Sequence, residues 1–482
     1  MKLIPTYKWA KSVRAINLSD KAFRQQPWAA GGVLILCVII AMLLANLPFT
    51  RDLYHDFLET SLTISIQSPI CQDGTRAIDW VFPKDMTVEK FINDILMVIF
   101  FFTVGLEIKR EMVCGELSSV KKAMMPVIAA AGGMAAPALI YTLFNIHTQA
   151  GSGWGIPTAT DIAFAVGIMS ILGNRVPISL KIFLTALAIA DDLGAILVVA
   201  FFYGGHINLL LLCIALVILA GIYIMKLMGE NRMMMYLIPA AAVWSLFYYA
   251  GIHATMSGVV MAFMIPMDAR YGKAYLFRRN KEYTHRLEAY DHIDEMESEF
   301  PNDLQRHCLR RMSHISRNSI GMSYRLEHAL NPWVNFCIMP IFALANAGVE
   351  IPDMSYFNIF QYSPEIGSVG MGIFFGLLLG KPIGITLASL LAIKLKVGEM
   401  PDKATWKMLF AVACLGGIGF TMSIFVDTLS FAEFPDMTEH LRSSGKIAVL
   451  MGSLCSGILG SVLIALFNRS EQSKKNSLSH QK

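Results

Sequence analysis

Two adjacent carboxylates stand in the middle of a long apolar stretch of the sequence. Asp191 and Asp192 follow Leu187-Ala-Ile-Ala and precede Leu-Gly-Ala-Ile-Leu, so apolar residues surround the pair on both sides. Neighbouring residues of a helix point about 100° apart, which lets one carboxylate face a pathway while the other faces a neighbouring helix. Acids this close repel each other, so the pair is able to take up protons near neutral pH or to bind a hard cation through oxygen. The alternative, a solvated pair at a helix end, requires polar flanking residues, which this stretch lacks.

Two other apolar runs contain residues that break helices. Pro157, Thr160 and Asp161 interrupt one run, and the glycine-rich stretch 416–419 interrupts another. A pair of interrupted helices in the two halves of a membrane transport protein is the best sequence indication of its binding site. The N-terminal ends of such half-helices carry partial positive charge, so we expect Asp161 to offset them.

A single lysine lies within a further apolar run, at Gly380-Lys381-Pro382. A charge at the centre of a spanning helix costs roughly 2.5–3.5 kcal/mol on insertion scales, so it usually faces a cavity and marks an ion pathway. Burial disfavours an ammonium ion, so a lysine beside one of the acids is a candidate proton carrier. The alternative is a lysine that extends along the helix to the membrane interface.

The elements that must hold these residues are membrane helices. Of the 482 residues, 55% are hydrophobic and 16% are charged, whereas a soluble protein carries charge on about a quarter of its residues. Apolar runs of about 20 residues, enough to cross about 30 Å of hydrocarbon, recur between short charged stretches. The sequence therefore predicts an all-α polytopic membrane protein with about twelve spans, near 29–47, 91–113, 124–144, 156–173, 178–203, 207–227, 234–250, 253–267, 332–349, 367–393, 406–430 and 445–467.

The third to fifth and the tenth to twelfth of these spans each include one interrupted helix. We expect them to form an inverted repeat whose broken helices, the fourth and the eleventh, cross near the middle of the bilayer. The net charge of +4 gives no reason to expect a nucleic-acid partner, and the eight cysteines have no metal-binding spacing. We expect membrane lipid around the spans and no cofactor.

Basic residues concentrate in alternate loops, as expected for the cytoplasmic side of a membrane protein. The intervening loops have no Lys or Arg, at 144–155, 204–206 and 350–366. We therefore expect a cytoplasmic segment over 1–28, a transmembrane domain over 29–467 and a cytoplasmic tail over 468–482. The basic N-terminus ahead of the first span indicates a retained span rather than a removed signal peptide.

Two loops are long enough to fold on their own. Residues 48–90 are expected outside, and the alternation of apolar and polar residues at 62–66 predicts a short strand or hairpin. An exposed strand at 60–67 can pair with a second copy of the chain, so a homodimer through this edge is one expectation. Residues 268–330 are expected in the cytoplasm, either as a solvated and partly helical insertion or as a regulatory or partner-binding segment.

Five motifs follow one another along residues 29–467. They are Phe102-Thr-Val-Gly-Leu-Glu107-Ile-Lys-Arg110-Glu111, Thr158-Ala-Thr160-Asp161-Ile-Ala-Phe-Ala, Leu187-Ala-Ile-Ala-Asp191-Asp192-Leu-Gly-Ala, Gly380-Lys381-Pro382 and Gly419-Phe-Thr-Met-Ser-Ile. Together they resemble the NhaA family of sodium/proton antiporters, whose inverted-repeat architecture is established. The resemblance implies electrogenic exchange of cytoplasmic Na⁺ (or Li⁺) for external protons across the bacterial inner membrane, with a role in sodium and pH homeostasis.

The matching motifs imply roles for individual residues. Asp192 is implied as the principal Na⁺ ligand, and Asp191 as its partner, able to pair with Lys381. Thr160 and Asp161 are implied to line the site, with Thr160 close to the bound ion. The protein is therefore expected to be a transporter and not an enzyme.

The resemblance also implies a set of residues tied to the response to pH, namely Glu107, Arg110, Glu111, His253 and Glu327. The first three are equally well explained as interfacial charges that cap a span, and the last two as ordinary polar residues. Two features depart from the family pattern. The segment 268–330 is longer than the family's usual connection, and Asp427 stands where the family usually has an apolar residue. We expect Asp427 to reach the outer membrane interface.

Alternating access at one site, where protons and Na⁺ compete for Asp191 and Asp192, is the mechanism that these residues favour. A cation-coupled symporter of an organic solute would need polar ligand-binding groups that the apolar spans do not offer. An intramembrane aspartyl protease would need two carboxylates that share a proton and activate water, brought together from different helices. A channel is disfavoured because titratable groups would block its middle.

Overall fold

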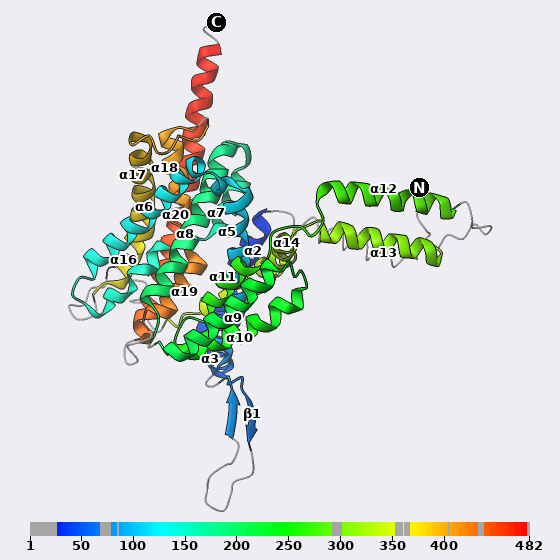
Figure 1. Cartoon of the computed structure of the whole chain (residues 1–482). Helices are drawn as coiled ribbons and strands as arrows, with labels where there is room; N and C mark the ends of the chain where they lie inside the picture. The colour runs from blue at the N-terminus through cyan, green and yellow to red at the C-terminus, as the bar shows by residue number, and fades with distance from the viewer. Residues whose placement is uncertain are drawn as a thin grey trace, which may run out of the picture. The chain divides into compact units, whose positions relative to one another are not determined.

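The computed structural model of the chain describes residues 27–67, 79–83, 86–205, 207–291, 301–351, 360, 367–402, 404–431 and 438–479. These residues fall into two compact units (Figure 1). The larger unit takes its residues from Met1–Phe100, Glu111–Gly205 and Pro332–Lys482, and the smaller from Phe101–Arg110 and His206–Asn331.

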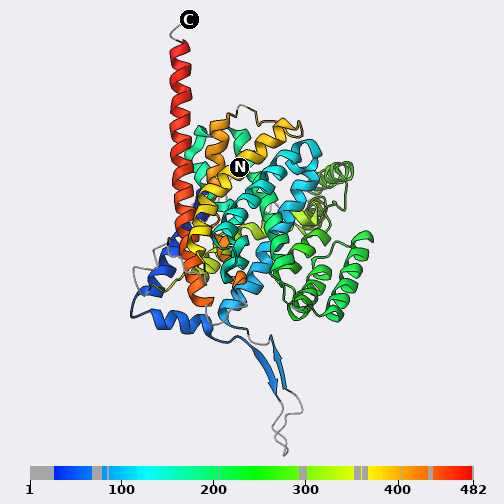
Figure 2. The same cartoon turned by 90° about the vertical axis from the view of Figure 1, so that its left-hand side faces the viewer.

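The larger unit is built from long apolar helices. Its main helices are α2 (Pro27–Asn46), α3 (Arg51–Glu59), α4 (Val88–Phe91), α6 (Val120–Phe144), α7 (Ile162–Leu172), α8 (Ile178–Phe202), α15 (Met339–Asn346), α16 (Val369–Phe375), α17 (Lys381–Lys394), α18 (Trp406–Leu415), α19 (Phe420–Ser430) and α20 (Thr438–Ser479). Figure 2 shows α20 as one long helix. Leu184 of α8, Met169 of α7 and Leu409 of α18 meet in a buried core that holds the middle of these helices together.

Among the described residues, ten helices are long and apolar enough to cross a membrane, and the bent pair α18 and α19 makes an eleventh span. The nearly all-helical fold expected from the sequence is confirmed. The eighth expected span, 253–267, is instead the ten-residue helix α11 (Thr255–Met264). At 1.5 Å per residue it covers only about 15 Å, half of the hydrocarbon layer.

The helices α6 and α17 pack against each other at an unusually short distance. A Cβ atom on Gly132 of α6 would lie 2.6 Å from the carbonyl oxygen of Gly384, and a Cβ on Gly384 would collide with the backbone of Gly132. Small residues at a helix crossing let two backbones approach in this way. The contact fixes the start of α17, where Lys381 lies.

Three spans of the larger unit contain a π-helical turn, at η1 (Ile92–Leu96), η5 (Val334–Ile338) and η7 (Gly376–Gly380). Such turns insert an extra residue into a helix and are frequent at functional sites. The turn η7 ends directly before Lys381. It therefore helps to set the direction in which this lysine leaves its helix.

A two-stranded antiparallel sheet forms in the long loop between α3 and α4. Strand β1 (Ile64–Gln67) pairs with β2 (Asp79–Phe82), with Ile64 opposite Phe82. Figure 2 shows the two strands side by side. Its connecting residues, 68–78, lie outside the described part of the chain.

The smaller unit contains α9 (Leu209–Leu227), α10 (Met233–Ala250), α11, and most of α14 (Met322–Trp333). Leu219, Val243 and Phe247 form part of its buried core. The stretch of α5 (Met97–Cys114) from Phe101 to Arg110 also belongs to it, through the buried Leu106.

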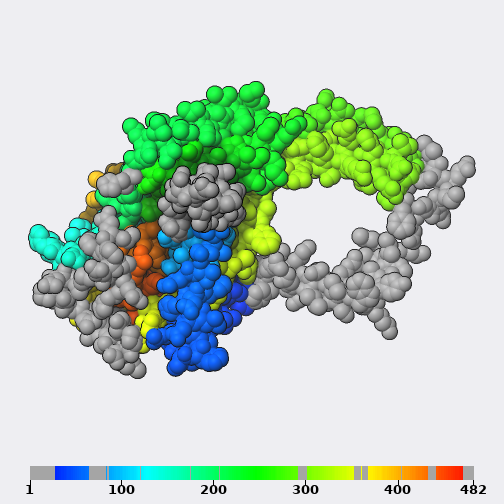
Figure 3. Space-filling view, turned by 90° about the horizontal axis from the view of Figure 1, so that it is seen from below, coloured from blue at the N-terminus to red at the C-terminus, as the bar shows by residue number. Residues whose placement is uncertain are grey.

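The insertion expected over 268–330 is largely helical. The helices α12 (Lys273–Asp291) and α13 (Asp303–Asn318) pack along each other (Figures 1 and 3). Asn302 begins α13 with a capping box, since it accepts from the backbone of Gln305, whose side chain accepts from the backbone of Asn302. Cys308 and Ile315, two helical turns apart, are the buried residues of α13.

Candidate functional site

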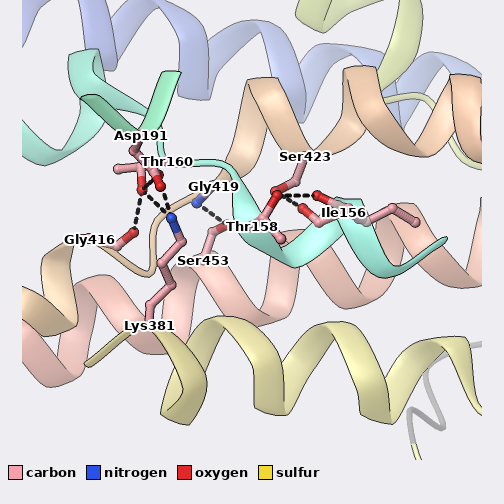
Figure 4. A network of polar contacts seen from close by, with 10 residues as sticks. Ile156, Thr158, Thr160, Asp191, Lys381, Gly416, Gly419, Ser423 and Ser453 are labelled. Atoms are coloured by element: carbon pink, nitrogen blue, oxygen red, sulfur yellow. Dashed lines mark hydrogen bonds and ion pairs between the residues drawn. The ribbon is translucent and has the colours of Figure 1, made fainter. Parts of the chain in front are cut away.

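Two interrupted helices meet at the centre of the larger unit. The 3₁₀ helix η3 (Gln149–Thr158) and α7 are separated by the extended residues 159–161, and α18 and α19 are bent by 52° at 416–419. The backbone N–H of Asp161 donates to the carbonyl of Ile418 at 2.6 Å, so the two breaks lie against each other. Both predicted interruptions are confirmed, and they meet in the arrangement shown in Figure 4.

Asp161 caps the N-termini of two helices at once. Its Oδ1 accepts from the backbone N–H of Phe164 in α7 at 3.2 Å. Its Oδ2 accepts from the hydroxyl of Thr421 at 2.6 Å and from the backbone N–H of Thr421 at 3.3 Å, in the first turn of α19. A carboxylate is stabilised at a helix N-terminus by free N–H groups and by the helix dipole. The structure therefore places Asp161 where the sequence analysis expected it, between facing N-terminal ends.

Thr160 joins the broken helices to α8 and α17. Its hydroxyl lies 2.6 Å from Oδ2 of Asp191 and 2.9 Å from the carbonyl oxygen of Gly416, and donates to one of them. It accepts from the ammonium of Lys381 at 2.8 Å. Lys381 also forms an ion pair with Asp191, and both side chains are fully buried. Figure 4 shows Thr160, Asp191, Gly416 and Lys381 close together.

Asp192, the second carboxylate of the pair, is 3% exposed and follows Asp191 in α8. It lies close enough to Lys381 to act on it electrostatically. The Oδ1 atom of Asp191 has no hydrogen-bond partner and is buried. The centre of the unit thus gathers carboxylate and hydroxyl oxygens, the ligands that a hard cation prefers, around one ammonium group.

Serine residues bind backbone groups that the helix breaks leave without a helical partner. Ser423 donates to the carbonyl of Ile156 at 2.7 Å, and Ser453 accepts from the N–H of Gly419 at 3.3 Å (Figure 4). Irregular backbone at membrane depth requires such partners. The sequence analysis assigned no role to these serines, because an isolated serine in an apolar span gives no sign of which helix break it will face.

Four of the five residues expected to respond to pH lie in the smaller unit. Arg110 lies 3.3 Å from Glu327 and 3.7 Å from Glu107, and the Glu327 side chain is 3% exposed. His253 is half-buried just before α11. Glu111 belongs to the larger unit, where it accepts from the backbone N–H of Glu116 at 3.1 Å. The fold therefore brings Glu107 and Arg110 of α5 and Glu327 of α14 into one charge cluster.

Lys109 is a buried charge that the sequence analysis did not single out. It is 8% exposed. Its ammonium donates to the carbonyls of Ala262 at 3.3 Å, Phe263 at 2.8 Å and Ile265, at the C-terminus of α11. A lysine at this end satisfies carbonyls that have no helical partner. Its position in Leu106-Glu107-Ile108-Lys109 was visible, but its partners lie more than 150 residues away.

Asp427 lies elsewhere than the sequence analysis expected. It was expected to reach the outer interface, but its side chain is fully buried in α19. Its position near the end of a span suggested exposure. The prediction is wrong because α20 covers this face of α19.

The sequence is similar to known proteins over most of its length. The profile of the family described as Na⁺/H⁺ antiporter 1 matches residues 21–464. The Na⁺/H⁺ antiporter NhaA of Pelagibacter ubique is 40% identical over 447 residues, covering 92% of this chain and 97% of that protein. The protein of the same name from Escherichia coli O1:K1 is 38% identical over 434 residues, covering 90% and 94%. The solved sodium proton antiporter MjNhaP1 from Methanocaldococcus jannaschii at pH 8 gives a TM-score of 0.47 at 12% identity, covering 91% of this chain and 97% of that chain.

Proposed function

The chain belongs to the Na⁺/H⁺ antiporter 1 family and exchanges sodium ions for protons across a bacterial membrane that it crosses many times, and from this premise we propose that both ions use one site at Asp191 and Asp192. The observation that carries this proposal is the burial of both carboxylates beside two broken helices and Lys381. An apolar span holds two acids away from water only where they bind an ion or a proton.

Asp192 is the principal Na⁺ ligand in this proposal, and Asp191 is its partner. Asp191 is held by Lys381 and Thr160 in the present arrangement. Its free oxygen, Oδ1, is available to a cation. Protons and Na⁺ then compete for the same carboxylates, because a protonated carboxyl loses the charge that attracts a cation. Thr160 adds a hydroxyl oxygen to the site.

Asp161 and Lys381 have supporting roles in the proposal. Asp161 offsets the partial positive charge of the two half-helix ends, so that these ends do not repel the transported cation. Lys381 balances the charge of Asp191 when no Na⁺ is bound. Lys381 is also a candidate to carry a proton, because in this proposal its partner Asp191 changes charge when the site binds Na⁺ or a proton.

Transport follows from competition and needs no further cofactor. Only the loaded forms reorient between the two sides of the membrane, so the downhill movement of protons drives Na⁺ in the opposite direction. We propose the bacterial inner membrane as the location, with both termini in the cytoplasm, outward transport of Na⁺ or Li⁺, and net movement of charge. The alternation of basic loops supports this orientation. The role is sodium and pH homeostasis.

Two further proposals concern regulation and assembly. The cluster of Glu107, Arg110 and Glu327, together with Glu111 and His253, adjusts the exchange to pH. The outer hairpin β1–β2 offers an edge to a second copy of the chain, and membrane lipid surrounds the spans.

Measurement of Na⁺/H⁺ exchange by the Asp192→Asn variant in everted vesicles tests the shared site. Na⁺ added to vesicles with an acidified interior should relieve the quenching of a pH-sensitive dye for the wild-type protein and leave it unchanged for Asp192→Asn. Repeating the addition with Li⁺ and K⁺ over a range of pH defines the ion preference. Asp52→Asn makes the same chemical change at a side chain that is 87% exposed, and should exchange at the wild-type rate.

The variant must also be folded for this result to count. Asp192→Asn should elute from size-exclusion chromatography in detergent as the wild-type protein does. Purified wild-type protein should release protons when Na⁺ is added, and Asp192→Asn should not. Exchange retained by a folded Asp192→Asn protein would remove this residue from its proposed role.

A further inference from the structure

The half-helix α19 carries a buried carboxylate, Asp427, that the proposed shared site does not include. Asp427 is eight residues beyond Gly419, which corresponds to about 12 Å along a helix. Its side chain is fully buried, and neither carboxylate oxygen has a hydrogen-bond partner among the residues that the structure describes. A buried charge without a partner is strongly disfavoured, so this carboxylate must be compensated by something nearby or be neutral.

The face of α20 beside Asp427 leaves room for it and supplies two cations. Gly445 lies directly against the carboxylate, where any Cβ atom would collide with Oδ1 of Asp427. Arg442 and Lys446 of the same helix face lie close enough to act on Asp427 electrostatically. Arg442 donates to the carbonyl of Thr428 at 2.7 Å, next to Asp427, while its Nε has no partner.

The other titratable groups around Asp427 are hydroxyls already in use. Tyr141 of α6 donates to the carbonyl of Ala150 at 2.7 Å, and Tyr203 donates to the carbonyl of Ser152 at 2.7 Å. Both are near enough to sense Asp427 electrostatically. Glu89 also acts electrostatically on Lys446.

This environment suits a proton and not a metal ion. A hard cation needs several oxygen ligands, and here two positive side chains stand beside a single carboxylate. Among the described residues, no group of three or more His, Cys, Asp or Glu side chains is placed to hold a metal. Burial favours the neutral acid and the two cations favour the carboxylate, so the two effects oppose each other.

We propose that Asp427 is a second proton-binding site of the exchanger, which takes up and releases a proton beside Arg442 and Lys446 and does not itself bind Na⁺. A proton on Asp427 leaves the two cations uncompensated and makes this end of α19 more positive. One unit charge acting over about 12 Å, the length of helix between Asp427 and the break at Gly419, changes the affinity for a cation by up to about tenfold at an effective dielectric constant of 20. Protonation of Asp427 therefore weakens Na⁺ binding when the solution with which Asp427 exchanges protons is acidic.

Infrared difference spectra of the purified protein test the site directly. Between a low and a high pH, without Na⁺, the wild-type protein should lose a carbonyl band of a protonated carboxylic acid that Asp427→Asn lacks. Saturating Na⁺ should lower the midpoint of this band by no more than about one pH unit, because the coupling between the two sites is reciprocal, and more Na⁺ should shift it no further. Ser430→Ala, on the same half-helix, should keep the band and serves as the matched control.

Two results would overturn the proposal. If the pH-difference spectra of Asp427→Asn and the wild-type protein coincide, Asp427 keeps one protonation state over this pH range and is not a proton-binding site of the exchanger. If the midpoint of the Asp427 band keeps falling as Na⁺ rises, Na⁺ and the proton compete at Asp427 and the residue belongs to the cation path. Should Asp427→Asn fail to fold, Lys446→Met keeps the acid and should shift its band to higher pH; an unshifted band would contradict the proposal.

Transport kinetics provide a second readout. Asp427→Asn imitates the protonated acid, so at high pH its KM for Na⁺ should rise by up to about tenfold at unchanged maximal rate. At low pH its KM should converge on that of the wild-type protein. Because this inference rests on the proposed function only in taking Asp192 as the Na⁺ ligand, loss of Na⁺-induced proton release in Asp192→Asn tests that function separately.

Discussion

Two lysines lie buried in apolar helices, one in each compact unit, and their partners differ in kind. Lys381 of the larger unit binds the carboxylate of Asp191 and the hydroxyl of Thr160. Lys109 of the smaller unit donates its hydrogen bonds to backbone carbonyls, at the end of α11. Carbonyls cannot change charge, whereas a carboxylate can. A buried charge in a membrane helix therefore indicates ion chemistry only when its partners can themselves change their charge.

Lys381→Met should have the largest effect, because it leaves Asp191 buried without its cation. Removing one member of a buried ion pair destabilises a protein by roughly 3–5 kcal/mol. We expect loss of exchange and a marked fall of the melting temperature in detergent. The double variant Asp191→Asn/Lys381→Met removes both charges and should recover stability without exchange. Wild-type exchange by Lys381→Met would break the contrast between the two lysines.

Asp161→Ala should come next, since it removes the cap of α7 and of α19 together. The loss of one N-cap costs about 0.5–2 kcal/mol. Asp161→Asn keeps one acceptor oxygen, for the N–H of either Phe164 or Thr421, and removes the charge. We expect the Asp161→Ala variant to have lower thermal stability than the Asp161→Asn variant. Both variants should have a higher KM for Na⁺ than the wild-type protein. Equal stability of the two variants would show that the hydrogen bonds at the half-helix ends contribute little.

Lys109→Met tests the other side of the comparison. It removes a cation from a helix C-terminus, which contributes up to about 2 kcal/mol in a partly buried setting. The melting temperature should fall, while the maximal rate and the pH dependence of exchange stay at wild-type values. A shift of the pH dependence would mean that Lys109 takes part in the response to pH as well as in capping α11.

Glu327→Gln should have the smallest effect on exchange. Arg110 loses its partner at 3.3 Å but keeps Glu107 at 3.7 Å. We expect an unchanged maximal rate and a shift of less than about one unit in the pH of half-maximal exchange. Glu282→Gln breaks exposed ion pairs with Arg279 and Arg286 in α12 and should shift nothing. If Glu327→Gln and Glu282→Gln show the same pH of half-maximal exchange, Glu327 does not belong to the residues proposed to respond to pH.

The sequence predicted the centre of the fold well because the signals there are local. Asp191, Asp192 and Lys381 are conspicuous in apolar runs, and Pro157 and the glycines at 416–419 break helices wherever they occur. The crossing of the two breaks could also be inferred, since two interrupted helices satisfy their free backbone groups most readily at a shared site.

The sequence did not predict which neighbour each polar residue meets. Hydropathy indicates how deep a residue lies, but not which direction its side chain takes around the helix axis. The buried position of Asp427 depends on Gly445 in another helix, and that of Lys109 on the end of α11. The reciprocal hydrogen bonds between Asn93 and Asn346 likewise join segments 253 residues apart. Such pairs are set by tertiary packing.

The double cap at Asp161 has a mechanical consequence. Because one side chain holds the leading ends of α7 and α19, neither half-helix can slide by more than about the length of a hydrogen bond without loosening its counterpart. A displacement of the Asp161 side chain would remove the caps of α7 and α19 together. The starts of α7 and α19 are thus coupled through a single side chain, so that displacement of one half-helix disturbs the cap of the other.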